Sequence, residues 1–89
     1  MKKHIIVHGK VQGVGFRDFT RQEANKKNVF GWVKNNSDGT VELKAEGDNK
    51  NMEEFIDSLA EGNSFSKVDH LDINEAKEID HENSFEVKY

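Results

Sequence analysis

The stretch from Val7 to Arg17 carries residue types that suit the binding of a compact oxyanion. Its sequence is Val-His-Gly-Lys-Val-Gln-Gly-Val-Gly-Phe-Arg, so three glycines separate a β-type run from an arginine. Glycine lets backbone N–H groups approach a ligand closely and adopts φ values that other residues avoid. The Arg17 guanidinium supplies a permanent charge and a planar fork of donors. If a helix begins here, its free N–H groups and its dipole add to the attraction, and we predict a site for phosphate.

This loop matches neither of the common nucleotide-binding motifs. Gly13-Val14-Gly15 begins a dinucleotide pattern, but Asp18 stands where that pattern requires its third glycine. No Gly-Lys-Ser/Thr triplet follows, so the loop is not a Walker loop. A glycine-rich turn by itself is most often only a turn. Because an arginine adjoins this loop, we weigh anion binding equally with a turn that has no ligand.

A second group of candidate residues runs from Gly31 to Asn35, ahead of a hairpin signal at Asn36-Ser37-Asp38-Gly39. Asn35 is expected at the end of a strand. One interpretation makes it a turn-forming residue. The other makes it an amide that fixes a water or a substrate oxygen through its donor and its acceptor together.

Hydrophobic periodicity predicts the elements that must position these residues. The clearest strand alternates Val41, Leu43 and Ala45, and the clearest helical stripe contains Met52, Phe55, Ile56 and Leu59. Strands are predicted over residues 3–9, 29–35, 40–46, 68–76 and 84–89. One helix is predicted over residues 16–27, and a second between the capping residues Gly47-Asp48-Asn49 and Gly62, which ends it.

The order of these elements is β-α-β-β-α-β with one further strand, which is the split βαβ arrangement of ferredoxin-like folds. We predict an α+β sandwich in which an antiparallel sheet carries both helices on one face, because each helix has only one apolar stripe to bury. Residues 1–89 are expected to form a single domain, since a chain of this length supports one modest core.

The two candidate segments closely resemble the two signatures of the acylphosphatase family. The first signature reads aliphatic-x-Gly-x-Val-Gln-Gly-Val-x-Phe-Arg, and residues 7–17 match it throughout. The second reads Gly-aromatic-Val-x-Asn-x-x-x-Gly-x-Val with a glycine six residues further on, and residues 31–47 match it. Chain length and element order fit the same family.

The resemblance implies hydrolysis of acyl phosphates to a carboxylate and inorganic phosphate. It assigns Arg17 to the phosphoryl group and Asn35 to the attacking water, with no cofactor and no metal. Inorganic phosphate is then a product and a competitive inhibitor. The implied phosphate-binding loop consists of Gln12, Gly13, Val14, Gly15, Phe16 and Arg17.

This assignment agrees with the chemistry of the reaction. Phosphoryl transfer depends mostly on positioning and charge stabilisation, which one arginine, several amides and a held water can supply. The leaving carboxylate belongs to an acid with a pKa of roughly 4, so it departs as an anion and needs no general acid. The reaction therefore requires neither a well-placed histidine nor a metal.

Composition and residue spacing argue against nucleic-acid, membrane and metal partners, and they indicate the cellular compartment. The net charge of -4 disfavours a general nucleic-acid surface, and no apolar run is long enough to span a bilayer. His4 and His8 lie about 13 Å apart along a strand, too far to share one metal ion. The chain lacks cysteine and any signal peptide pattern, and we expect a cytoplasmic monomer with no membrane partner.

Two other functions compete with the enzyme. One is a non-catalytic anion-binding or nucleic-acid-binding module on the same fold, which the acidic charge and an outward row of Glu42, Lys44 and Glu46 disfavour. The other is an accessory domain of a larger enzyme, because the family's domain also occurs in carbamoyl-transferring maturation proteins. The start at Met1 and the length of 89 residues favour an independent enzyme.

Overall fold

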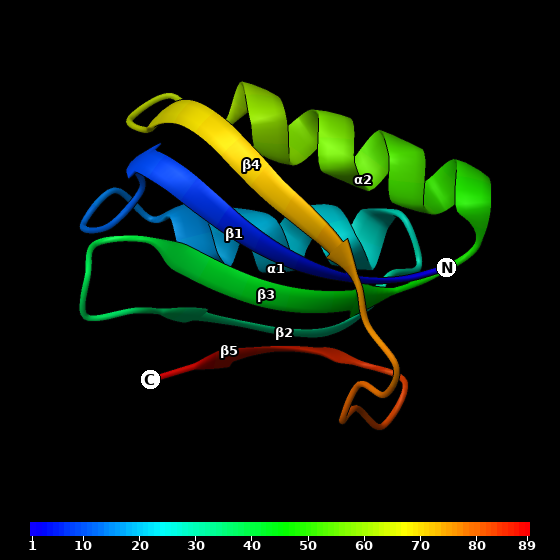
Figure 1. Ribbon diagram of the computed structural model, residues 1–89. Helices are drawn as coiled ribbons and strands as arrows, with labels where there is room; N and C mark the ends of the chain where they lie inside the picture. The colour runs from blue at the N-terminus through cyan, green and yellow to red at the C-terminus, as the bar shows by residue number, and fades with distance from the viewer.

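The computed structural model describes all 89 residues and arranges them as one sheet with two helices (Figure 1). The elements are β1 (Lys2–Lys10), α1 (Phe16–Lys26), β2 (Phe30–Asn35), β3 (Val41–Glu46), α2 (Asn49–Glu61), β4 (Lys67–Glu75) and β5 (Phe85–Lys88). Every predicted element is present, and its bounds agree with the prediction to within about two residues.

The sheet has the strand order β4-β1-β3-β2-β5. Each of the first four strands in this order is antiparallel to its neighbours among them, as predicted, whereas β5 pairs in parallel with β2. The reason lies in the direction of the chain. After β4 the chain turns back across one end of the sheet, and its return direction is the direction in which β2 runs (Figure 1).

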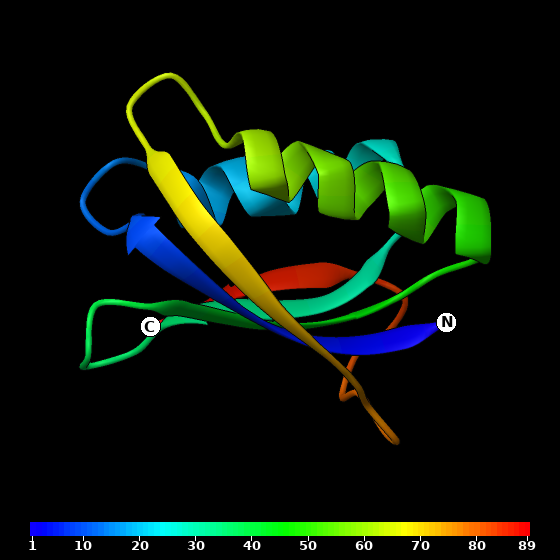
Figure 2. The same ribbon diagram turned by 45° about the horizontal axis from the view of Figure 1, so that its top comes forward.

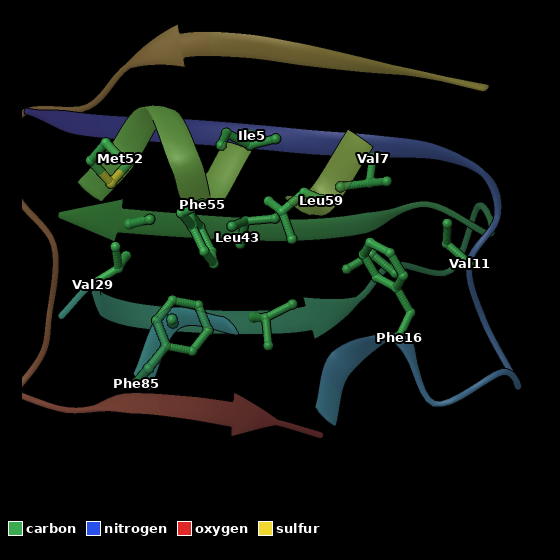
Figure 3. Packing of buried hydrophobic residues seen from close by; sticks show 14 residues of the cluster. Ile5, Val7, Val11, Phe16, Val29, Leu43, Met52, Phe55, Leu59 and Phe85 are labelled. Carbon is green, nitrogen blue, oxygen red and sulfur yellow. The ribbon is translucent and has the colours of Figure 1, made fainter. Parts of the chain in front are cut away.

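Both helices cover the same face of the sheet, as their single apolar stripes require, and leave the other face open (Figure 2). The strands therefore alternate: Ile5 and Val7 of β1 are fully buried under the helices, while His4, Ile6 and His8 lie on the open face. Figure 3 shows the packed side chains. The core consists of Ile5, Val7, Val11, Phe16, Ala24, Val29, Val33, Val41, Leu43, Ala45, Met52, Phe55, Leu59 and Phe85.

Local signals set the ends of the helices. Helix α1 begins after Gly15, and Asn28 follows its end with a φ of 53° in the left-handed region, which asparagine tolerates. Helix α2 begins at an N-cap, where the Asp48 side chain accepts a hydrogen bond of 2.8 Å from the N–H of Asn51. It ends at Gly62, as the sequence predicted. Neither helix has the length and apolar character that a bilayer crossing requires.

Candidate active site

The two sequence motifs meet because of the register of three neighbouring strands. Val41 of β3 pairs with Val7 of β1 on one side and with Asn35 of β2 on the other. The end of β1, where the glycine loop departs, is therefore level with the end of β2, with only β3 between them. Asn35 and the loop are brought to one end of the sheet although the two motifs are separate in sequence.

A cavity of about 480 Å³ opens where these segments meet. It contains the predicted residues Arg17 and Asn35 together with part of the glycine loop. Its full lining is Val11, Gly13, Gly15, Phe16, Arg17, Asp18, Arg21, Asn35, Val87 and Tyr89.

The backbone of the loop is arranged as an anion site requires. Gly13 and Gly15 have φ values of 73° and 74°, a left-handed conformation that only glycine adopts without strain. The N–H groups from Gln12 to Asp18 donate to no other group of the protein. Those at the start of α1 also lie at the positive end of the helix dipole. Seven consecutive N–H groups are thus unpaired, and those of the residues that line the cavity are available to a phosphate.

Arg17 is held in place by the last residues of the chain. Its Nη1 donates a hydrogen bond of 3.0 Å to the carbonyl oxygen of Lys88, and its guanidinium lies 4.6 Å from the centre of the Tyr89 ring. A cation–π contact at an exposed position contributes about 0.5–1 kcal/mol. This role of Lys88 and Tyr89 was not predicted from the sequence, in which they are only the end of a short closing strand.

The Asn35 side chain does not take part in the hairpin turn. The turn is closed by its neighbours: the Asn36 amide donates to Thr40 Oγ1 at 3.0 Å, and the Asp38 carboxylate accepts from the Thr40 N–H at 3.0 Å. The Oδ1 atom of Asn35 is buried without a hydrogen-bond partner. A buried polar atom of this kind calls for a partner such as a bound water or ligand. The turn-forming interpretation of Asn35 is therefore the weaker one.

Two residues of the predicted loop contribute differently from the rest, since neither Gln12 nor Val14 lines the cavity. The Gln12 side chain donates hydrogen bonds of 2.8 Å to the carbonyl oxygens of Asn36 and Thr40, which ties the loop to the hairpin behind Asn35. The Val14 carbonyl accepts a hydrogen bond of 2.8 Å from Asn63. Asn63 carried no signal in the sequence, because it lies far along the chain from the loop it supports.

Three charged side chains of α1 line the cavity: Arg17, Asp18 and Arg21. Hydrogen bonds from Arg21, and to a smaller extent from Gln22, hold the pKa of the Asp18 carboxyl below its ordinary value, so that group is an anion. Arg21 donates to the same carboxylate at 2.6 Å and balances its charge. Arg17 is then the cation left for a ligand, and the cavity favours an anion.

Comparisons with known proteins agree with this geometry. The acylphosphatase family model matches residues 3–87. An acylphosphatase of Bacillus licheniformis is 44% identical over 89 residues, which cover 100% of this chain and 99% of that protein. The crystal structure of acylphosphatase from Bacillus subtilis gives a TM-score of 0.92 at 41% identity, covering 99% of this chain and 98% of that one.

A structure of full-length HypF in a phosphate- and nucleotide-bound form also matches, with a TM-score of 0.89 and 35% identity. The match covers 99% of this chain but only 12% of HypF, so the same fold also occurs inside a much longer protein.

The fold and the cavity define a small ferredoxin-like α+β enzyme that acts on an anionic substrate. The chain belongs to the acylphosphatase family, whose members hydrolyse acyl phosphates. Nothing in the comparisons favours a non-catalytic anion-binding or nucleic-acid-binding module.

The loop conformation leads to a prediction about Gly13. Alanine at this position meets no atom within 4 Å but must hold a φ of 73°, which costs about 1–2 kcal/mol of folding free energy. Relaxation of that strain displaces the loop N–H groups, and we expect Gly13→Ala to lower kcat/KM for benzoyl phosphate by up to about 10²-fold. Steady-state kinetics and denaturant unfolding of the same variant measure both effects.

Gly39 provides a matched control. It has a φ of 92°, its Cβ position is equally unobstructed, and it lies in the hairpin turn outside the cavity. Gly39→Ala should lose similar stability and keep its kcat/KM. Wild-type kcat/KM in Gly13→Ala would show that the backbone of the loop does not bind the phosphoryl group.

Proposed function

We propose that the chain hydrolyses acyl phosphates by in-line attack of a water that Asn35 holds, on a phosphoryl group bound by Arg17 and the glycine loop. The observation that carries this proposal is the pairing of Val41 with both Val7 and Asn35. It brings Asn35, whose Oδ1 atom is buried without a partner, and residues of the glycine loop to the lining of one cavity.

In this mechanism the N–H groups of the loop residues that line the cavity and the Arg17 guanidinium bind the three non-bridging phosphate oxygens. Charge spreads over these oxygens in the transition state, and fixed donors in a preformed site stabilise it without reorganisation. The contacts of Arg17 with Lys88 and Tyr89 hold the guanidinium before substrate arrives. Inorganic phosphate fits the same donors, and we propose that it acts as a competitive inhibitor.

The attacking water hydrogen-bonds to the Asn35 amide on the side of the phosphorus opposite the leaving carboxylate. Its oxygen forms the new P–O bond, the bond from phosphorus to the acyl oxygen breaks, and the carboxylate leaves with the electron pair. No histidine lines the cavity, and its one acidic side chain, Asp18, is bonded to Arg21. A phosphate oxygen is therefore the acceptor that we assign to the proton of the water.

The proposal includes no metal, because Arg17 and the loop N–H groups supply the positive charge that a metal would bring. We further propose that residues 1–89 form a single catalytic domain that works as a monomer in the cytoplasm. The sequence covers nearly the full length of its acylphosphatase relatives, which supports the single domain.

Hydrolysis of benzoyl phosphate, followed by loss of its ultraviolet absorbance, tests the activity and its metal independence together. We expect turnover that is unchanged after exhaustive dialysis against EDTA. If EDTA abolished turnover and one divalent metal restored it, the metal-free mechanism would be wrong. Phosphate binding without any turnover would instead indicate a non-catalytic anion-binding module.

Arg17 should be essential for turnover. We expect Arg17→Ala to lower kcat/KM by about 10³-fold or more, as for other arginines that stabilise a phosphoryl transition state. Arg17→Lys should also lose about 10²-fold or more, because an ammonium group cannot reproduce two parallel donors. Steady-state kinetics measure the loss of kcat/KM in each variant, and calorimetric titration measures its affinity for phosphate. Thermal unfolding checks that both variants fold.

Arg21→Lys is the matched control, since Arg21 lines the same cavity but is engaged with Asp18. Its kcat/KM should stay within a few-fold of the wild-type value. The same replacement of a guanidinium fork by a point charge is made there, but at a side chain that binds Asp18 and not the substrate. Substantial activity in Arg17→Lys would show that charge alone suffices and would refute two-point recognition.

Asn35 should act on chemistry rather than on binding. We expect Asn35→Ala to lower kcat by about 10²–10³-fold, the usual cost of one positioned polar group in an active site. The Kd for inorganic phosphate should stay close to the wild-type value, because Asn35 carries no charge. Kinetics, phosphate titration and the unfolding midpoint of the same variant separate these effects.

The neighbouring Asn36→Ala variant is the control, because the Asn36 amide closes the turn through Thr40. It should lose stability and keep its kcat. A stable Asn35→Ala protein with normal kcat would remove Asn35 from the mechanism. Loss of phosphate binding as severe as in Arg17→Ala would make Asn35 a ligand-binding residue instead.

A further inference from the structure

A second cluster of side chains that suits ligand binding lies on the open face of the sheet, on β1 and β4. The two strands are antiparallel neighbours, and His8 pairs directly with His70. Asp72 follows His70 by two residues on β4, so both side chains point to the same face. The three side chains thus come from two strands that are separated by most of the chain.

The cluster is compact. The His8 and His70 rings are stacked, with centres 4.0 Å apart and planes 9° from parallel. One carboxylate oxygen of Asp72 lies 2.8 Å from Nε2 of His8, and the other lies 3.8 Å from Nε2 of His70. One possible ligand atom from each residue lies within 4.8 Å of the other two. Ligands of a tetrahedral zinc ion at about 2.1 Å are about 3.4 Å apart, so the three groups are close enough to share one ion. The two rings must tilt out of their stack to direct their nitrogens at that ion.

The donor set selects the type of ion. Two imidazole nitrogens and one carboxylate suit divalent ions of the late first row, with Zn²⁺ and Cu²⁺ among the tightest binders. Mg²⁺ and Ca²⁺ prefer shells made of oxygen alone, so they do not fit a site with two nitrogen ligands. Three protein ligands leave a tetrahedral ion with one position for water, and all three residues are at least partly exposed.

We propose that His8, His70 and Asp72 form a binding site for a Zn²⁺-like divalent metal ion that bridges β1 and β4. None of the three residues lines the cavity at the end of the sheet. The site is therefore separate from the proposed catalysis, and its existence does not depend on the proposed function.

The other two histidines show what an ordinary histidine–carboxylate pair looks like in this fold. His4 meets Glu42 at 2.6 Å, and His81 meets Glu46 at 2.8 Å. Each of these pairs lacks a second histidine, and neither belongs to a group of three possible metal ligands. Only His8 and His70 each have a second imidazole and a carboxylate close by, and this distinguishes a chelating site from a simple ion pair.

Isothermal titration of the full chain with ZnCl₂, after removal of metal by EDTA and dialysis, tests the site directly. We expect one ion per chain. His8→Ala, His70→Ala and Asp72→Asn should each weaken binding by about tenfold or more, since even the loss of a residue that only supports a ligand costs 10–100-fold. A free zinc concentration ten times the Kd should raise the melting temperature of the wild-type protein by about 5 °C or more. The ion binds the folded chain, in which the two strands are paired, and not the unfolded chain.

His4→Ala is the matched control, because His4 lies on the same strand and the same face and is bonded to a single carboxylate. It should bind zinc as the wild-type protein does. Benzoyl phosphate turnover and circular dichroism confirm that each variant is folded, and His70→Gln serves as a second variant if His70→Ala is unstable.

Several results would overturn the proposal. One is the absence of saturable binding with a Kd below about 1 mM. Another is wild-type zinc affinity in His70→Ala. A third is a loss of zinc affinity in His4→Ala equal to that in His70→Ala, which would indicate adventitious binding by scattered histidines. Zinc binding that depends on Arg17 or Asn35 but not on His70 would place the ion in the active-site cavity instead.

Discussion

The pairing of β3 with β1 on one side and β2 on the other is the constraint on which the rest of the site depends. Val41 is the shared neighbour of Val7 and Asn35, and its side chain is fully buried. A shift of register by one residue would turn every buried side chain of a strand to the open face, so the core holds this register firmly. The same burial that stabilises the fold therefore brings the glycine loop and Asn35 together.

The site combines a backbone loop with one charged side chain. Left-handed glycines shape the loop, and hydrogen bonds from Gln12 and Asn63 fasten it to the hairpin and to the segment after α2. Arg17 projects from the first turn of α1 and is steadied only at the exposed C-terminal residues. The anion site thus has a fixed backbone part and a guanidinium that the last strand orients. Donors that are arranged before substrate binds suit a reaction that depends on charge stabilisation more than on acid–base chemistry.

The sequence predicted the elements well because their signals are local. Alternation in 41–45, the helical spacing from Met52 to Leu59, and the turn residues around Gly39 each involve neighbours along the chain. The direction of β5 was different from the antiparallel expectation for the sheet, because nothing in residues 84–89 states which strand they will join. That choice depended on the open edge beside β2 and on the side to which the chain returned after β4.

By itself, the sequence determined the order of the elements, the family motifs and two candidate residues, Arg17 and Asn35. Only the tertiary structure decided which distant groups would meet: Tyr89 with Arg17, Asn63 with Val14, and His70 with His8. The spacing of His4 and His8 argues against a metal ion shared by those two residues, but it could not reveal His70 across the sheet. The physical reason is that periodicity records which face a side chain takes. Strand pairing and chain return, which the whole core stabilises together, determine the neighbour it finds on that face.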